Sequence, residues 1–166
     1  MERNVHCWRT KVLFGDIDYF GVVFYLKYFD WCTQAREHFI LSHHPEELNT
    51  VCPSVIEVSH KFHHAARLND DIHIEISFHE IKRTSVWMYF QIHRLTGEHT
   101  QLIGTHRQRI LFLTRDGKIT RMSSALFSTL QRYACRAFEG TTRDERSLGL
   151  HRHRNLLSVT PVTEPF

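Results

Sequence analysis

Four consecutive segments of the sequence alternate apolar and polar residues with a period of two. They cover residues 54–62, 71–80, 84–94 and 101–113. Alternate residues of an extended strand point to the same side, so this period predicts four β-strands. Turn-forming residues, Thr96-Gly97-Glu98, separate the third segment from the fourth. Strands joined by such short turns predict an antiparallel sheet.

The residues before these strands change from a strand pattern to a helical one. Residues 5–14 alternate and predict a first strand, whereas residues 25–41 repeat apolar side chains at helical spacing. One sector of the helical wheel holds Tyr25, Tyr28, Phe29, Cys32, Ala35 and Phe39. A second helix is predicted at 123–138, with Ser123 or Ser124 at its start and Gly140 at its end. This order predicts an α+β fold with one face of the sheet on the long helix.

The length of 166 residues suits one domain. We expect residues 1–139 to form it, and residues 140–166, which are polar and aperiodic, to form a tail that is flexible or ordered by a partner. The net charge is only +3, from 21 Lys and Arg against 18 Asp and Glu, which argues against nucleic acid as a partner. No segment approaches the roughly 18 apolar residues of a membrane span, so we expect no membrane partner.

Cysteine and histidine spacing argues against a metal site. No close pair occurs among the four cysteines, Cys7, Cys32, Cys52 and Cys135. We therefore expect reduced thiols in a cytoplasmic protein. His63 and His64 are neighbours and would point to opposite faces of a strand. His60 lies on an apolar strand face, where we expect a hydrogen-bonded core residue or a residue that lines a pocket.

The segment between the first strand and the long helix carries the clearest chemical signal. Asp16 and Asp18 lie two residues apart in it, and Gly21 follows. A helix N-terminus presents unpaired N–H groups and a positive dipole end. A carboxylate facing such an end combines a base or nucleophile with donors for a developing oxyanion, as acyl transfer requires. The alternative is that one aspartate caps the helix or forms an Asx turn.

Two stretches, FGDIDYFGVVFYLKYFDW and AREHFI, resemble the opening of the hotdog-fold acyl thioesterases of the 4-hydroxybenzoyl-CoA thioesterase type. The residues that match the family pattern are Asp16, Asp18, Gly21, Val22, Val23, Phe24, Tyr28, Ala35 and Arg36. Two later segments, AARLNDDIHIEI and IKRTSVWMYFQIHR, resemble strands of that family. The resemblance covers residues 5–115 and implies a curled antiparallel sheet of about five strands around one long helix.

The resemblance also implies roles for the residues of the turn. Asp18 would be the nucleophile or general base that acts on a thioester, and Asp16 would form the turn. Backbone N–H groups at the helix start, near Tyr25, would hold the thioester carbonyl. The substrate would also contact Gly21, Val22, Val23 and Tyr28. The resemblance implies neither cofactor nor metal, and a substrate carried by CoA or by an acyl carrier protein.

Arg36 has a signal of its own, because it lies in the apolar sector of the predicted helix. A charge there forms an ion pair, snorkels to solvent, or contacts the substrate or Asp18. A branch of the family that is associated with enediyne polyketide synthases is similar through Tyr25, Tyr28, Trp31, Arg36, Glu37, Phe39 and the stretch HHPEEL. In that branch the helix arginine does much of the work, which implies a catalytic role for Arg36. The catalytic role expected of Tyr25 is the one already given, at the helix start that holds the thioester carbonyl.

Basic residues and sheet faces predict the partners. Lys82 and Arg83 would meet the phosphates of CoA or an acidic carrier protein, unless they are ordinary surface residues. Trp87 and Tyr89 lie opposite the other apolar residues of 84–94, so both faces of that strand are too apolar for water. We therefore expect a homodimer or homotetramer in which a second subunit covers one face.

The favoured function is hydrolysis of an acyl thioester to a free acid and a thiol, with release of a polyketide or fatty acyl chain. A non-hydrolytic acyl-binding hotdog protein is the alternative, because Lys27 replaces the asparagine that many members have before the tyrosine. A histidine-rich metal-binding or nucleic-acid-binding module is a third hypothesis. The weak net charge and the scattered ligands argue against it.

Overall fold

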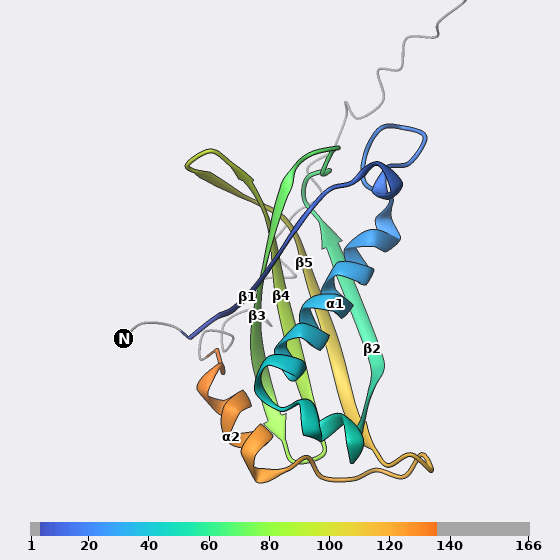
Figure 1. The fold of residues 1–166 in the computed structure, drawn as a ribbon, viewed down its shortest axis with the longest axis vertical. Coiled ribbons are helices and arrows are strands. Elements are labelled where there is room, and N and C mark those ends of the chain that lie inside the picture. Colours follow the sequence, from blue (N-terminus) through green and yellow to red (C-terminus); the bar gives the residue numbers. More distant parts are fainter. Residues whose placement is uncertain (1–3, 136–166) are drawn as a thin grey trace, which may run out of the picture. The chain divides into compact units, whose positions relative to one another are not determined.

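The structure is a computed structural model that describes residues 4–135, which belong to one compact unit (Figure 1). Its main elements are β1 (His6–Lys11), α1 (Tyr25–His43), β2 (Cys52–Phe62), β3 (Asp71–Lys82), β4 (Ser85–Thr96), β5 (His99–Leu113) and α2 (Ser124–Arg132). Two short 3-10 helices, η1 (Phe14–Asp16) and η2 (Pro45–Asn49), precede and follow α1. The tail predicted at 140–166 and the domain boundary at residue 139 lie outside the described residues.

The five strands form one antiparallel sheet in the order β1-β3-β4-β5-β2. Short turns join β3, β4 and β5, as the alternation and the Gly97 turn predicted. The strands curl around α1, which crosses one face of the sheet (Figure 1). The predicted α+β hotdog fold is therefore confirmed. Of the helices within residues 4–135, none combines the length and apolar character that crossing a membrane requires.

The core lies between α1 and the inner face of the sheet, which is the face toward that helix. The buried residues of α1 are Tyr28, Trp31, Cys32, Ala35, Phe39 and Ile40. The apolar set predicted on β3 and β4 meets them with side chains such as Ile74, Phe78 and Phe90, which are at most 1% exposed. The helical wheel placed Tyr25 in the apolar sector that faces the core, and this was wrong, because Tyr25 is 53% exposed. As the first residue of the helix, it extends beyond the sheet that covers the later turns.

The predicted C-terminal ends of β1 and α2 were wrong, because backbone hydrogen bonds to distant residues determine where these two elements end. β1 ends at Lys11, since the Val12 N–H donates to the Asp70 carbonyl, and Phe14 turns into solvent. α2 ends at Arg132 instead of residue 138. The next residues extend the sheet: the Phe78 N–H donates to the Tyr133 carbonyl, and the Phe78 carbonyl accepts from Cys135.

The outer face of the sheet carries Trp87 and Tyr89, which are half-buried. The guanidinium groups of Arg107 and Arg109 lie 5.1 and 5.8 Å from the Trp87 ring centroid. Cations of the same sheet therefore shield this tryptophan from water. That a second subunit covers this face stays a prediction.

Candidate functional site

Asp16 is a structural residue of the turn before α1. Its buried carboxylate accepts a 2.9 Å hydrogen bond from the Leu13 N–H through Oδ2 and lies 3.1 Å from Lys27 Nζ through Oδ1. Its carbonyl accepts a 2.8 Å bond from the Phe24 N–H, directly before the helix. These contacts use both carboxylate oxygens to fix the chain entry into α1. The hydrogen bond from Lys27 to Asp16 also raises the pKa of that lysine.

Asp18 is held by one oxygen only. Its Oδ1 accepts hydrogen bonds from the backbone N–H groups of Phe20, at 2.8 Å, and Val22, at 3.3 Å. Gly21 has a φ of +71°, a conformation that glycine adopts without strain, and its N–H donates to the Asp18 carbonyl. Nothing within residues 4–135 donates to Oδ2 of Asp18. The Asx turn considered from the sequence is therefore present, yet it leaves one carboxylate oxygen available.

The start of α1 keeps backbone donors available. Phe24 occupies the N-cap position, and no side chain caps the helix there. The Val23 N–H donates to the Ala66 carbonyl at 2.9 Å, and the Ile17–Val23 bridge ties the two arms of the turn together. In the described part of the chain the Tyr25 N–H has no acceptor. The turn thus presents a carboxylate and an unpaired amide at the positive end of a 19-residue helix.

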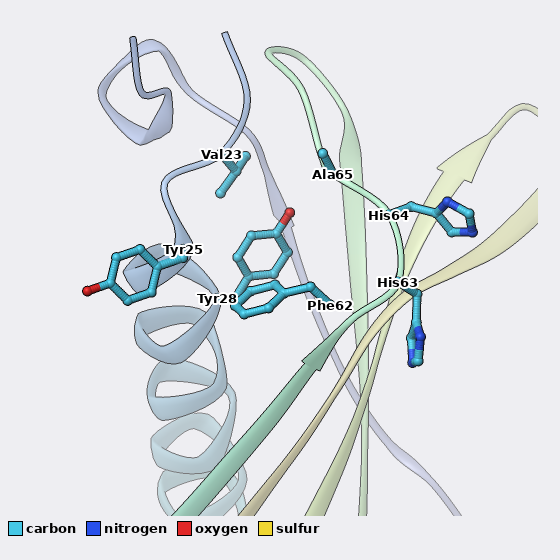
Figure 2. Close-up of a pocket in the computed structure, with 7 residues that line it drawn as sticks. All are labelled: Val23, Tyr25, Tyr28, Phe62, His63, His64 and Ala65. Atoms are coloured by element: carbon cyan, nitrogen blue, oxygen red, sulfur yellow. The ribbon is translucent and has the colours of Figure 1, made fainter. Parts of the chain in front are cut away.

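A cavity of about 260 Å³ opens beside this helix start, lined by Val23, Tyr25, Tyr28, Phe62, His63, His64 and Ala65. Figure 2 shows Val23, Tyr28 and Phe62 facing a common space, while the Tyr25 ring and the two histidine rings point away from it. The Tyr28 and Phe62 ring centroids are 5.4 Å apart. The Tyr28 hydroxyl accepts a 2.9 Å bond from the Ala66 N–H, so it fixes the segment after β2 as the far wall.

Other predicted site residues lie apart from this cavity within one chain. Lys82 ends β3, and Arg83 lies against α2, with its guanidinium 4.2 Å from the Phe127 ring centroid. This turn is at the end of the sheet beside α2, opposite the start of α1 (Figure 1). Gly21 and Val22 shape the turn through their backbone and do not line the cavity.

Arg36 is half-buried and reaches the sheet instead of the turn. Its Nη1 donates a 2.7 Å hydrogen bond to Oε1 of Gln108 on β5. Burial lowers the pKa of its guanidinium. Arg36 lies eleven residues after Tyr25, which is about 16 Å along an α-helix, so one chain does not bring it to Asp18. The partner of the half-buried Arg36 guanidinium is therefore the neutral side-chain amide of Gln108, a contact that the sequence did not predict.

His60 is hydrogen-bonded in the core, as one of its two expected roles required. Its Nδ1 lies 3.1 Å from Nδ1 of His106, and Nε2 of His106 lies 3.0 Å from Nε2 of Gln108. Burial lowers the pKa of His60 to about 4 and that of His106 to about 3. Among residues 4–135, no group of three or more His, Cys, Asp or Glu side chains is arranged to hold a metal.

Comparison with known proteins names the family. A sequence model of the thioesterase-like superfamily matches residues 12–130, which include the turn, both helices and all of the sheet except β1. The chain belongs to the thioesterase-like superfamily. This membership supports acyl thioester hydrolysis as its class of activity. A search of curated proteins gave no significant match.

Solved structures share the fold of this superfamily member. The dynemicin thioesterase, described with bound polyene, is 20% identical with a TM-score of 0.75, over 80% of this chain and 99% of that one. A 1,4-dihydroxy-2-naphthoyl-CoA thioesterase from Synechocystis is 15% identical with a TM-score of 0.69, over 77% and 96%. A gentisyl-coenzyme A thioesterase is 22% identical with a TM-score of 0.64, over 72% and 98%. At these identities the likeness establishes the fold.

Proposed function

We propose that this chain hydrolyses acyl thioesters at the turn before α1, with Asp18 as general base or nucleophile. One observation carries the proposal: the Tyr25 N–H has no acceptor within the described residues and lies at the start of α1, next to the apolar cavity. An amide at the positive end of a helix stabilises negative charge that develops on a bound carbonyl oxygen. The thioesterase-like family supports the same reaction class.

In the proposed reaction the thioester carbonyl oxygen accepts a hydrogen bond from the Tyr25 N–H. Oδ2 of Asp18 then removes a proton from water, which attacks the carbonyl carbon, or attacks that carbon itself. Negative charge moves to the carbonyl oxygen and is stabilised by the amide and the helix dipole. In the general-base route the C–S bond breaks, Asp18 returns its proton to the departing thiolate, and the free acid remains. In the nucleophilic route the thiolate leaves and takes a proton from solvent, and water then hydrolyses the mixed anhydride between the acyl group and Asp18, which gives the free acid and restores the carboxylate. Oδ1 keeps the carboxylate oriented through the amides of Phe20 and Val22.

The cavity supports an apolar acyl group as the part of the substrate that it accepts. Val23, Tyr28 and Phe62 face the common space with apolar atoms. We propose a carrier of CoA or acyl carrier protein type and a polyketide or fatty acyl chain. Lys82 and Arg83 would contact the carrier of a site in a second subunit, because they lie far from the cavity of their own chain.

The proposed assembly is a homodimer formed through β2. This strand lies at the edge of the sheet, and four of its apolar residues are 44 to 52% exposed: Val55, Ile56, Val58 and Phe62. A long apolar edge strand is a template for pairing with another chain. Phe62 also lines the cavity, so pairing at this edge would place a second subunit beside the site. We further propose a cytoplasmic location, since residues 4–135 contain no disulfide.

The test is hydrolysis of a panel of acyl-CoA and acyl-carrier thioesters by Asp18→Asn, followed with a thiol reagent. The substitution keeps the acceptor for the two amides but removes the base, so kcat should fall at least about 100-fold. Normal turnover in this variant would reject Asp18 as the catalytic carboxylate and favour Arg36 with water. If the wild type binds these thioesters without hydrolysing them, the chain is the acyl-binding protein instead.

Asp16→Ala is the matched control, because both carboxylates belong to the same turn. It removes the hydrogen bond to Leu13 and the ion pair with Lys27, which should lower the free energy of unfolding by about 1–3 kcal/mol. Its kcat per folded molecule should fall far less than that of Asp18→Asn. Equal losses of kcat in the two variants would mean that the turn geometry, and not the Asp18 base, is what was damaged.

A further inference from the structure

Four polar side chains form a continuous hydrogen-bonded network beneath α1, which we call the inner polar network: Arg36, Gln108, His106 and His60. Its three hydrogen bonds measure 2.7, 3.0 and 3.1 Å. Its middle members are buried, with His106 at 0% and Gln108 at 3% exposure. The network joins α1, β5 and β2, and neither the turn nor the helix start belongs to it.

The hydrogen bonds of this network can be donated in only one direction, from Arg36 toward His60. Arginine has no acceptor, so Gln108 must present its carbonyl oxygen to Arg36 and its NH₂ group to His106. Nε2 of His106 therefore accepts, and its proton is on Nδ1, which donates to Nδ1 of His60. The remaining proton of His60 is on Nε2. All three acceptors are used, and only donors remain at the two ends.

Both histidines are neutral, which the direction of the network requires. Burial, and after it the electrostatic effect of His63, lower the pKa of His60 to about 4. Burial, His60 and Arg36 together lower the pKa of His106 to about 3. Near neutral pH the network therefore carries one charge, the guanidinium of Arg36.

One end of the network, His60, contacts two residues that line the cavity. The His60 ring centroid is 4.1 Å from that of Phe62 and 5.6 Å from that of Tyr28, and both of these rings line the cavity. Phe29 of α1 stacks on the other side of His60, at 5.3 Å. Nε2 of His60 is buried over the backbone of Gly104, where an added Cβ would lie 3.1 Å from it, and it has no hydrogen-bond partner within the described residues. A buried unpaired donor costs about 1–3 kcal/mol, so an acceptor that reaches it is favoured.

The other end of the network, at Arg36, is partly exposed. Arg36 and His60 are both half-buried, and Val58, which pairs with Gln108 in the sheet, is 45% exposed. Arg36 has no carboxylate within ion-pair distance in the described part of the chain. An acyl chain that continues from the cavity along α1 would pass the donors of His60 first and those of Arg36 next.

We propose that the inner polar network selects acyl chains that carry a hydrogen-bond acceptor, such as a ketone oxygen, beyond the thioester carbonyl. The inference rests on the proposed thioesterase function and adds the substrate class. Phe29, which covers His60, is one helical turn beyond Tyr25, about 6 Å along the axis. The oxygen that His60 recognises is therefore several bonds beyond the reacting carbonyl and distinct from it.

The test compares two acyl-CoA thioesters of equal chain length, one a saturated hydrocarbon and one with a mid-chain ketone. In the wild type, kcat/KM for the ketone should exceed that for the hydrocarbon about tenfold, which corresponds to about 1.4 kcal/mol. His60→Phe keeps the aromatic stack and removes the donor, so the ratio should fall to about one. Gln108→Met breaks the network in its middle and should also lower the ratio. Because both substrates are measured on the same sample, partial unfolding of a variant does not change the ratio.

His73→Phe is the matched control. Nε2 of His73 is also buried without a hydrogen-bond partner, but His73 lies on the outer face of the sheet, paired with Arg9 and His93. This variant should keep the ratio of the wild type. A ratio near one in the wild type, an unchanged ratio in His60→Phe, or an equal loss in His73→Phe would overturn the inference.

Failure of the proposed function has a different signature, because then neither thioester is hydrolysed. In that case calorimetric binding of the two free acids decides the inference. Tighter binding of the keto acid by the wild type than by His60→Phe supports it, and equal binding overturns it.

Discussion

At the scale of single residues, Asp16 and Asp18 show how neighbouring carboxylates take different roles. Asp16 uses both oxygens to hold the turn, whereas Asp18 uses one and keeps Oδ2 accessible. The difference follows from local backbone geometry, since Gly21 brings the amides of Phe20 and Val22 around one oxygen of Asp18. This difference is the reason why we propose Asp18, and not Asp16, as the carboxylate that acts on the substrate.

Arg36→Met tests the helix arginine at this scale. The change keeps the length and apolar stem of the side chain but removes the charge, so we expect kcat/KM to fall at least about tenfold. The free energy of unfolding should change by only about 1 kcal/mol, because the lost bond to Gln108 is offset by relief from burying a charge. Steady-state kinetics and thermal unfolding measure the two effects. A variant that unfolds yet keeps its activity per folded molecule would make Arg36 purely structural.

The residues that could be predicted from the sequence are those that act through local geometry. Asp18, Gly21 and Tyr25 belong to one short turn, whose pattern is visible in the sequence. Gln108 and Phe62 were missed because their partners are 72 and 34 residues away, in Arg36 and Tyr28, and sequence periodicity does not report such contacts. The pairing of β2 with β5 places His60 opposite His106, and the packing of α1 on the sheet brings Arg36 to Gln108.

At the scale of elements, periodicity predicted where each strand and helix lies but not where it ends. α2 begins as predicted, with Ser123 accepting a 3.1 Å bond from the Leu126 N–H. It ends early because residues 133–135 form backbone hydrogen bonds with Phe78 of β3, and no local pattern encodes that competition. Tertiary hydrogen bonds override a helical repeat at its end.

Ser123→Ala tests the cap of α2. Loss of the cap should lower the free energy of unfolding by about 1 kcal/mol. Catalysis should be unchanged, because α2 lies at the opposite end of the sheet from the turn (Figure 1). Ser124→Ala is the control: Ser124 caps no amide, and its hydroxyl only accepts an exposed bond from Arg83, so its change should be smaller. Chemical denaturation measures both, and equal losses would contradict the capping role.

At the scale of the whole molecule, buried histidines make stability depend on pH. Burial is the main cause that lowers the pKa of His6 to about 4, of His60 to about 4 and of His106 to about 3. In the unfolded chain the pKa of a histidine is about 6.5. Between the two values the unfolded state binds more protons, so acid favours unfolding and stability rises with pH.

The melting temperature should therefore fall as the pH is lowered from about 7 to about 5. His6 accounts for part of this fall, since its ring is buried against Phe39 and lies 3.0 Å from the Nδ1 atom of His38. In His6→Phe the fall should be smaller than in the wild type. Scanning calorimetry across this range measures it, and a melting temperature that does not change with pH would contradict the neutral state of these histidines.

Assembly is the other property of the whole molecule. Light scattering at micromolar concentration should give at least twice the chain mass of 19.8 kDa. Ile56→Lys places a charge on the exposed edge strand β2 and should shift the protein toward the monomer. Ile119→Lys, at a residue 64% exposed after β5, should leave the dimer intact, as should removal of residues 140–166. A monomeric wild type that hydrolyses thioesters would reject the proposed dimer.

The local closure of the turn before α1 has a consequence for how such proteins diversify. Its hydrogen bonds run almost entirely between residues 13 and 24, with Val23 to Ala66 as the tie to the rest of the fold. The inner polar network uses none of these residues. Substitutions at positions 60, 106 and 108 can therefore accumulate, by drift or by design, without breaking the hydrogen bonds of the turn that is proposed to catalyse the reaction. On the two proposals made above, substrate range and chemistry become separately heritable traits on one small scaffold.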